Sequence, residues 1–391
     1  APGAHGYGVC PSDNDLEAVM IKKQEGFTIV ELLLAMMLFV LTIVAASNIF
    51  VPLLTQFKQQ SKIAETQTEG IVSLELFRRD IEQAGFGLPW NIPSNVTYQE
   101  ASSSPASSYN DSTSNPPRAI LSGNDIISNP VIGTSDYLVI KSTIVGANDA
   151  APKWTYIVNN GAGGSVKSWG SKDDLAPADR VIALLPSRGS SETSQRILVN
   201  NGSAFSVPYA NVIANFLPAV QNDKYLIYGV NANTDLSMPF NRADYYISTS
   251  VPVPPRCAPG AGELVKSVIN QRGGRRGSGM PLLDCVADME IVFGLDVNND
   301  GSLTYTNDIT ALTARQIRDG VKEVRIYILS HEGQKDITYT FSAFTPGACA
   351  TCVRVGEFGL GRDFNLASMG TDWANYRWRV YTMVVQPRNL S

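Results

Sequence analysis

The chain has 391 residues, of which 44% are hydrophobic and 17% are charged, and its formal net charge is −5. This composition is typical of a folded globular protein and excludes both a disordered chain and a membrane protein with many spans. The small negative charge gives no electrostatic reason to expect a nucleic-acid partner. Histidine occurs only at His5 and His331. This scarcity disfavours a hydrolase with a histidine base and a histidine-rich metal site.

The first 19 residues contain no apolar targeting segment. Met20, followed by Ile-Lys-Lys-Gln-Glu-Gly, would make a short basic leader by itself. We therefore expect residues 1–26 to be a leader in which Met20 is the true start and residues 1–19 are an upstream extension.

An apolar run begins at Gly26-Phe27-Thr28-Ile29-Val30-Glu31 and continues to about Phe50. Its length predicts a membrane-spanning helix over 27–51. Lys22 and Lys23 precede it, and basic residues on that flank place the start of the helix in the cytoplasm. Glu31 is a carboxylate inside this run, where an ionised side chain is costly and marks a functional position.

Gly26, Phe27 and Glu31, with the intervening Thr-Ile-Val and the following Leu-Leu-Leu, resemble the motif of type IV prepilins. The resemblance implies that a prepilin peptidase cleaves after Gly26 and methylates Phe27. It also implies that the N-terminal amine of a neighbouring subunit neutralises Glu31, so that the pair sets the register between subunits in a fibre.

A secretory signal peptide is the alternative interpretation of the same segment. Ala45-Ala46-Ser47 has the small residues that such a peptide needs at its cleavage site. Cleavage there would release the remainder of the chain as a soluble protein.

The helix is expected to continue beyond the membrane, over 52–88. Pro52 would bend it, because proline removes a backbone donor and clashes with the preceding turn. Apolar residues then recur at near-helical spacing among Lys, Glu and Gln: Ile71, Leu74, Leu76, Phe77 and Ile81. Gly85, Gly87 and Pro89 predict its end.

The remaining part, 89–391, reads as a β-rich head. Residues 94–117 are rich in Ser, Asn, Pro and Thr and predict an exposed loop. Short runs rich in Val, Ile and Tyr predict strands at Tyr137–Ile140, Val181–Leu185, Tyr225–Val230, Asp244–Ile247, Met289–Leu295, Val321–Leu329, Ile337–Phe341 and Arg377–Val385. They favour antiparallel sheets over βαβ units, so the expected class is α+β, a long helix joined to a sheet-rich head.

Four patches resemble PilW-type minor pilins of the type IV pilus: Leu76–Gly87, Met289–Gly301, Asp319–Leu329 and Arg379–Leu390. Together they hold 48 of the 391 residues. The resemblance implies a pilin fold, and it extends to the large minor pseudopilin of type II secretion. Residues 90–285 match no known pattern and are expected to form a large insertion in the head.

Of the five cysteines, all but Cys10 follow the apolar segment. An even number of cysteines beyond a membrane anchor predicts two disulfides in an oxidising compartment. We expect the pairs Cys257–Cys285 and Cys349–Cys352, although three pairings are open. A redox or metal-binding role for Cys349-Ala-Thr-Cys352 is disfavoured by its Thr, Pro and Gly surroundings.

The segment Asp296-Val-Asn-Asn-Asp-Gly-Ser resembles the opening of an EF-hand calcium loop, with oxygen ligands at alternate positions. The twelfth position is Asn307 rather than glutamate, and Asp308 falls one place late. The candidate calcium ligands are Asp296, Asn298, Asp300, Ser302, Thr304 and Asp308. A plain turn built on side-chain oxygens remains the alternative.

No Gly-x-Ser-x-Gly, His-Glu-x-x-His or P-loop motif occurs, so we expect a protein that is not an enzyme. The resemblance implies a minor pilin that is anchored in the inner membrane with a periplasmic head and then enters a type IV pilus. Its expected partners are prepilin peptidase, other minor pilins and the major pilin, with no nucleic acid. The alternatives are a type II secretion pseudopilin, a tip adhesin that binds a ligand through 90–285, and a membrane-anchored exported enzyme.

Overall fold

The computed structural model describes residues 26 and 28–390, except 188, 190, 192, 193, 251, 346 and 348. The expected leader with Met20, Lys22 and Lys23, and the residue Phe27, lie outside the described residues. The chain divides into two compact units after Lys58, and each unit is described by itself.

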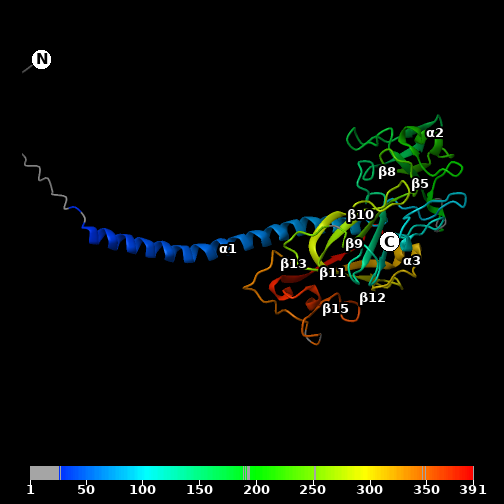
Figure 1. Ribbon diagram of the computed structural model, residues 1–391. Coiled ribbons are helices and arrows are strands. Elements are labelled where there is room, and N and C mark those ends of the chain that lie inside the picture. The colour runs from blue at the N-terminus through cyan, green and yellow to red at the C-terminus, as the bar shows by residue number, and fades with distance from the viewer. Residues whose placement is uncertain are drawn as a thin grey trace, which may run out of the picture. The chain divides into compact units, whose positions relative to one another are not determined.

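Helix α1 spans Ile29–Glu82 and is drawn as one continuous element in Figure 1. Its 54 residues correspond to about 80 Å at 1.5 Å per residue. Pro52 lies inside the helix and does not end it. The predicted long helix is therefore confirmed, and it is long and apolar enough to span a membrane.

The second part of α1 buries one narrow face. Gly70, Leu74, Phe77 and Ile81 follow one another at spacings of three or four residues and are buried or partly buried. A Cβ atom on Gly70 would lie 3.1 Å from Leu283, so glycine lets the helix approach the sheet closely there. Apolar residues on the other faces, including Ile71 at 68% exposure, stay on the surface.

The end of α1 is fixed by its glycines, as expected. Gly85 and Gly87 have φ values of +84° and +68°, which favour glycine. A Cβ atom on Gly87 would lie 2.4 Å from Thr143 Oγ1, so any other residue there would collide with Thr143.

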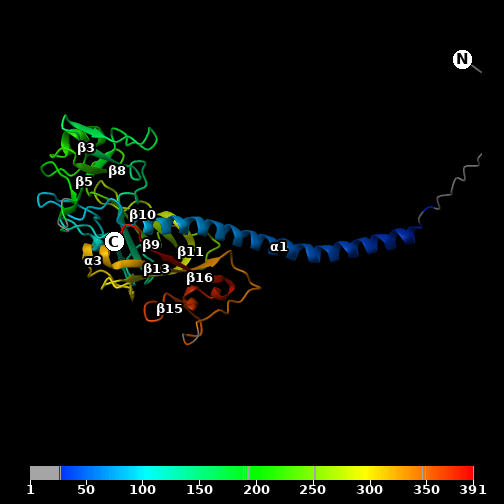
Figure 2. The same ribbon diagram turned by 180° about the vertical axis from the view of Figure 1, so that it is seen from behind.

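The main sheet of the head is antiparallel. Its order is β1-β2-β9-β10-β11-β13-β16, and β12 pairs with β11 (Figures 1 and 2). The strands are β1 (Ile120–Gly123), β2 (Tyr137–Ser142), β9 (Asn241–Ser248), β10 (Gly262–Val268), β11 (Met280–Leu295), β12 (Thr304–Thr306), β13 (Val321–Glu332) and β16 (Arg377–Val385). Helix α3 (Ala314–Gly320) leads into β13 and begins at Thr313 with a capping box.

The two faces of the main sheet are covered by different parts of the chain. On one face Phe77 of α1 stacks on Tyr245 of β9, with ring centroids 4.5 Å apart. Tyr246 therefore points to the other face, because side chains alternate along a strand. There it stacks on Tyr137, which stacks on Tyr109. Residue 109 lies in the segment predicted to be an exposed loop.

That prediction was only partly right. The serine-rich tips of 94–117 are exposed, but Tyr98, Glu100 and Asp111 are at most 6% exposed. Glu100 and Asp111 form ion pairs with the buried Lys141 of β2, at 2.7 and 2.6 Å. The polar composition predicted contact with solvent. The structure instead buries Glu100 and Asp111 against the sheet, where they neutralise Lys141.

A second, smaller antiparallel sheet lies between β2 and β9 in the chain, with the order β4-β3-β8-β5-β6 and with β7 paired to β5. Its strands are β3 (Trp154–Asn159), β4 (Gly164–Val166), β5 (Arg180–Ser187), β6 (Gln195–Leu198), β7 (Val207–Pro208) and β8 (Lys224–Asn231), with helix α2 (Val212–Phe216). β5, β8 and α2 group together in Figure 1. Residues 90–285 thus supply β1, β2, β9 and β10 of the main sheet as well as the whole smaller sheet.

A third cluster of apolar residues lies beneath the two-stranded sheet of β14 (Cys352–Val355) and β15 (Arg362–Asn365). The predicted strand Ile337–Phe341 is wrong. Asp336 Oδ1 accepts hydrogen bonds from the backbone and hydroxyl of Thr338, which closes a turn. Ile337 is 82% exposed, so the apolar run did not indicate burial.

Candidate functional site

The start of α1 presents an exposed and mainly apolar surface. Every residue from 28 to 58 is exposed. Phe39 and Phe50 are 66% and 61% exposed. No lysine or arginine occurs between Ile29 and Phe57, and Glu31 is the single acidic residue of that stretch. Such a surface needs lipid or other apolar helices around it.

Glu31 takes part in a capping box that the sequence prediction missed. Its carboxylate accepts hydrogen bonds from the backbone and the hydroxyl of Thr28, at 2.9 and 3.0 Å. The Glu31 backbone N–H donates in return to Thr28 Oγ1, at 3.2 Å. Thr-x-x-Glu before an apolar run is the signal that could have revealed it. Gly26 is described and exposed, whereas Phe27 lies outside the described residues.

The other end of α1 is held by the C-terminal residues that follow β16. The Arg388 backbone N–H donates to the carbonyl of Glu82 at 2.9 Å, and its guanidinium lies 3.1 Å from the Glu82 carboxylate. Asn389 donates to the side chain of Gln83, and Leu390 is 2% exposed. These contacts satisfy a carbonyl of the last helical turn, which has no partner inside the helix.

The four patches that resemble minor pilins meet in this region. The last turns of α1 carry the first patch, and the other three include parts of β11, β13 and β16, which are neighbours in the main sheet. Phe77, Met289, Ile326 and Leu390 belong to one hydrophobic cluster. Patches separated by up to about 300 residues therefore form one helix-on-sheet core.

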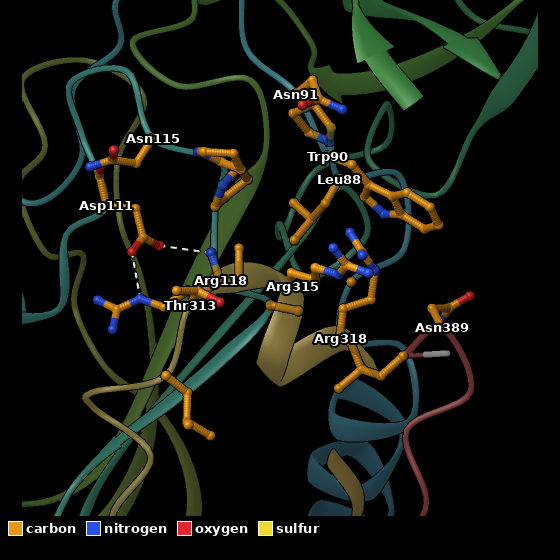
Figure 3. Close-up of a pocket in the computed structure, with 18 of the residues that line it drawn as sticks. Leu88, Trp90, Asn91, Asp111, Asn115, Arg118, Thr313, Arg315, Arg318 and Asn389 are labelled. Atoms are coloured by element: carbon orange, nitrogen blue, oxygen red, sulfur yellow. Dashed lines mark hydrogen bonds and ion pairs between the residues drawn. The ribbon is translucent and has the colours of Figure 1, made fainter. Parts of the chain in front are cut away.

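A pocket of about 550 Å³ lies beside this junction. Figure 3 shows the side chains of Arg315 and Arg318 near Trp90 and Leu88. The Arg318 guanidinium is 4.0 Å from the centre of the Trp90 ring, which is a cation–π contact. Arg118 lines the opposite part and pairs with Asp111 at 2.6 Å. Arg196 also lies over the Trp90 ring, at 5.4 Å, so the pocket presents guanidinium groups rather than a bare indole face.

The predicted calcium loop forms a turn in which side-chain oxygens accept backbone hydrogen bonds. Asp296 accepts from the N–H groups of Asp300 and Gly301, each at 3.0 Å, and Asp300 accepts from Ser302. Asp308 lies beyond β12 and accepts from Thr310, which lowers its pKa. These bonds agree with the plain-turn alternative, and calcium binding by 296–304 stays a prediction.

Both expected disulfides are present, Cys257–Cys285 and Cys349–Cys352. Cys352 is the first residue of β14, whereas a thioredoxin-like motif opens a helix. This placement favours a structural role for the Cys349–Cys352 pair.

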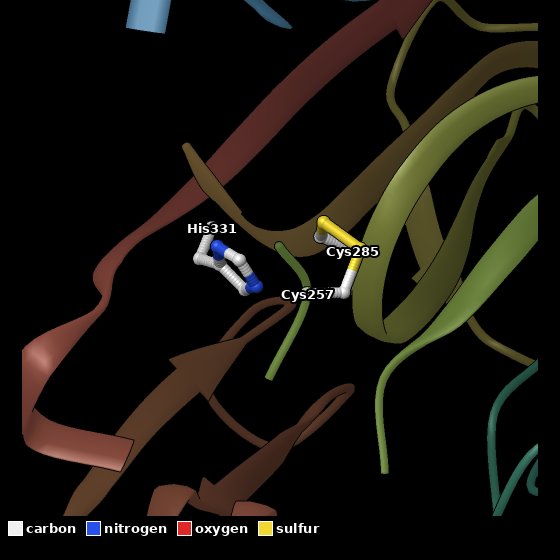
Figure 4. Close-up of side chains that lie close together, drawn as sticks. All are labelled: Cys257, Cys285 and His331. Atoms are coloured by element: carbon white, nitrogen blue, oxygen red, sulfur yellow. A yellow bond between two sulfur atoms is a disulfide. The ribbon is translucent and has the colours of Figure 1, made fainter. Parts of the chain in front are cut away.

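Cys257 and Cys285 are at most 9% exposed and lie next to His331 of β13 (Figure 4). His331 Nε2 accepts a hydrogen bond from the Ala258 backbone at 2.8 Å. Burial lowers the pKa of His331 to about 4, so the ring is neutral at physiological pH. Its packing against Tyr376 and Trp378 makes it a core residue rather than a catalytic base.

Comparison with family models, curated proteins and solved structures finds no match to this chain. Conclusions about its function therefore rest on the residues and their geometry.

Proposed function

We propose that this protein is a non-catalytic minor pilin that primes or caps a type IV pilus. Helix α1 holds it in the inner membrane, and the head docks on other minor pilins. The observation that carries the proposal is Glu31, a carboxylate in the first turn of an exposed apolar helix that has no cation before Lys58.

The energetic argument concerns how Glu31 is neutralised at membrane depth. An ionised carboxylate there costs roughly 3 kcal/mol. The hydrogen bonds from Thr28 satisfy oxygen atoms but supply no positive charge. A prepilin peptidase that cleaves after Gly26 would create an amine at Phe27, and the amine of a neighbouring subunit would supply that charge. The pairing would fix the axial register of each incoming helix.

The head supports the same proposal in a second way. Its four patches that resemble minor pilins form one core against the end of α1. The head also carries a second sheet, β3–β8, whose bulk would crowd a helical fibre at every subunit position. A subunit used once, at the tip, avoids that crowding.

Replacing Glu31 with glutamine is expected to reduce fibre number at least about tenfold, since a loss of 1.4 kcal/mol is a factor of about ten. Fibres would be counted by electron microscopy, and the protein would be detected in sheared fibres. Thr28→Ala removes the capping partner but keeps the charge, so it should assemble normally. Glu75→Gln is the matched control, because Glu75 is an exposed carboxylate of the same helix.

Normal assembly of Glu31→Gln would reject the register role. Equal loss in Thr28→Ala would show that Glu31 acts through helix capping. Mass spectrometry of the mature N-terminus tests processing independently, with methylated Phe27 as the expected first residue. Assays of piliation and of protein secretion in the same strains separate a pilus from a type II secretion pseudopilus.

The pocket beside Trp90 favours a second candidate function, a tip subunit that binds an acidic glycan. The guanidinium groups of Arg118, Arg315 and Arg318 in its lining suit a sugar that bears a carboxylate or sulfate. Arg318→Gln is expected to leave fibres intact and to weaken their adhesion to immobilised acidic glycans about tenfold, whereas the exposed control Arg272→Gln should not. Unchanged adhesion in Arg318→Gln would reject this function.

A further inference from the structure

Four carboxylates gather around the middle of β11, in a place that no sequence motif indicates. Asp288 and Glu290 alternate with Met289 and so lie on the same face of β11. Asp136 precedes β2, and Asp125 follows β1. Asp136 and Asp288 are fully buried, and Glu290 is 2% exposed.

Within the described part of the chain, Arg362 is the one basic residue that forms ion pairs with these acids. The Arg362 guanidinium donates two hydrogen bonds to Asp288. It lies 3.3 Å from Glu290 and 3.5 Å from Asp125. One positive charge therefore faces four carboxyl groups, which leaves most of their charge uncompensated.

Glu290 is the least satisfied member of the cluster. Its Oε1 atom is buried and has no hydrogen-bond partner among the described residues, although Arg362 is near. Burial and the neighbouring carboxylates raise the pKa of Glu290 to about 9 and that of Asp136 to about 7.

The spacing of the oxygens suits one ion. Ligand oxygens of Asp125, Asp136 and Glu290 all lie within 4.8 Å of one another. An ion can lie within about 2.8 Å of all three oxygens, which is close to the calcium–oxygen distance of about 2.3–2.6 Å. The backbone N–H groups of Asp125 and Ile291 each donate to one oxygen of Asp136 and hold its carboxylate in place.

We propose that Asp125, Asp136 and Glu290 bind a divalent cation, with calcium the best fit in size and ligand type. The ion would join the connection between β1 and β2 to the central strand β11. The site differs from the predicted loop at 296–304, because Glu290 and Asp296 are about 20 Å apart along an extended strand.

The test is calcium titration of the full chain in detergent, by calorimetry and by thermal unfolding in calcium against EGTA. Millimolar calcium is expected to raise the melting temperature by a few degrees. Glu290→Gln should lose one bound ion, or weaken that site at least about tenfold, and should show a smaller rise. In EGTA this variant should melt no lower than the unmodified protein, because glutamine removes a carboxyl group that is buried beside Asp136 and Asp288.

Two further variants make each outcome decisive. Asp300→Asn alters the loop at 296–304 and should leave the Glu290-dependent ion in place. Asp125→Asn changes the most exposed member of the cluster and decides the matter if Glu290→Gln fails to fold. The proposal is overturned if the protein binds no calcium at millimolar concentration, or if Asp300→Asn abolishes all binding. It also fails if the number and affinity of bound ions are unchanged in Glu290→Gln and Asp125→Asn.

Discussion

Replacing Arg242 with methionine is expected to lower the free energy of unfolding of the head by about 3–5 kcal/mol, because it leaves a buried charge uncompensated. Arg242 is fully buried in β9 and lies directly opposite Lys141 of β2. Like charges in that position repel each other. Glu100 lies between them, 2.7 Å from Lys141 and 3.1 Å from Arg242.

The charges of this network balance only as a set. Its cations are Lys141, Arg242 and Arg118, and its anions are Glu100, Asp111 and Asp244. Arg242 also donates to Asn110 and to the carbonyl of Ala106, so it holds the covering segment on the sheet. Removing it leaves one carboxylate in excess and frees that segment.

The measurement is denaturant unfolding of the full chain in detergent, followed by tryptophan fluorescence. Arg272→Met makes the same chemical change at an exposed position and should alter stability by less than about 0.5 kcal/mol. The double variant Arg242→Met with Asp244→Asn should recover part of the loss, because it restores neutrality. A loss below about 1 kcal/mol in Arg242→Met would contradict the importance of this balance.

Removal of the Cys257–Cys285 disulfide, by replacing both residues with serine, is expected to cost about 3–4 kcal/mol. The bond joins residues 28 apart, and its loss lets the unfolded chain gain the entropy of a long open loop. It also ties the segment before β10 to β11, beside the buried His331.

The Cys349–Cys352 disulfide provides an internal comparison. Its residues are 3 apart in sequence, so the same entropy argument gives only about 2 kcal/mol. Thermal unfolding of the two double-serine variants without reductant should therefore rank them in that order. The reverse order would show that local packing, rather than loop closure, sets the contribution of each bond.

The sequence could predict those parts of the fold that depend on neighbours in the chain. The apolar run predicts α1, and Gly85 and Gly87 mark its end. Runs of β-branched residues identify strands such as β13, because that pattern depends on a few adjacent positions. The failure at Ile337–Phe341 has a local cause too, since the turn at Asp336 and Thr338 outweighs the β propensity.

The parts that could not be predicted depend on residues far apart in the chain. Lys141, Arg242 and Glu100 look like separate surface charges until β2, β9 and the loop at 94–117 come together. The acids at Asp125, Asp136 and Glu290 likewise belong to different elements. For the same reason the sequence does not show which strands within 90–285 join the main sheet, because polarity and loop length carry no information on pairing.

The meeting of Glu82 with Arg388 has a consequence for the order of events during synthesis. The contact spans about 300 residues, and such non-local contacts form late and slowly. Until residues 377–390 have been made, β13 lacks its neighbour β16, and the end of α1 lacks its contacts with Arg388 and Asn389. During this interval β13 is an unpaired edge strand, although the apolar helix is already complete. Another strand could then pair wrongly with the edge of β13.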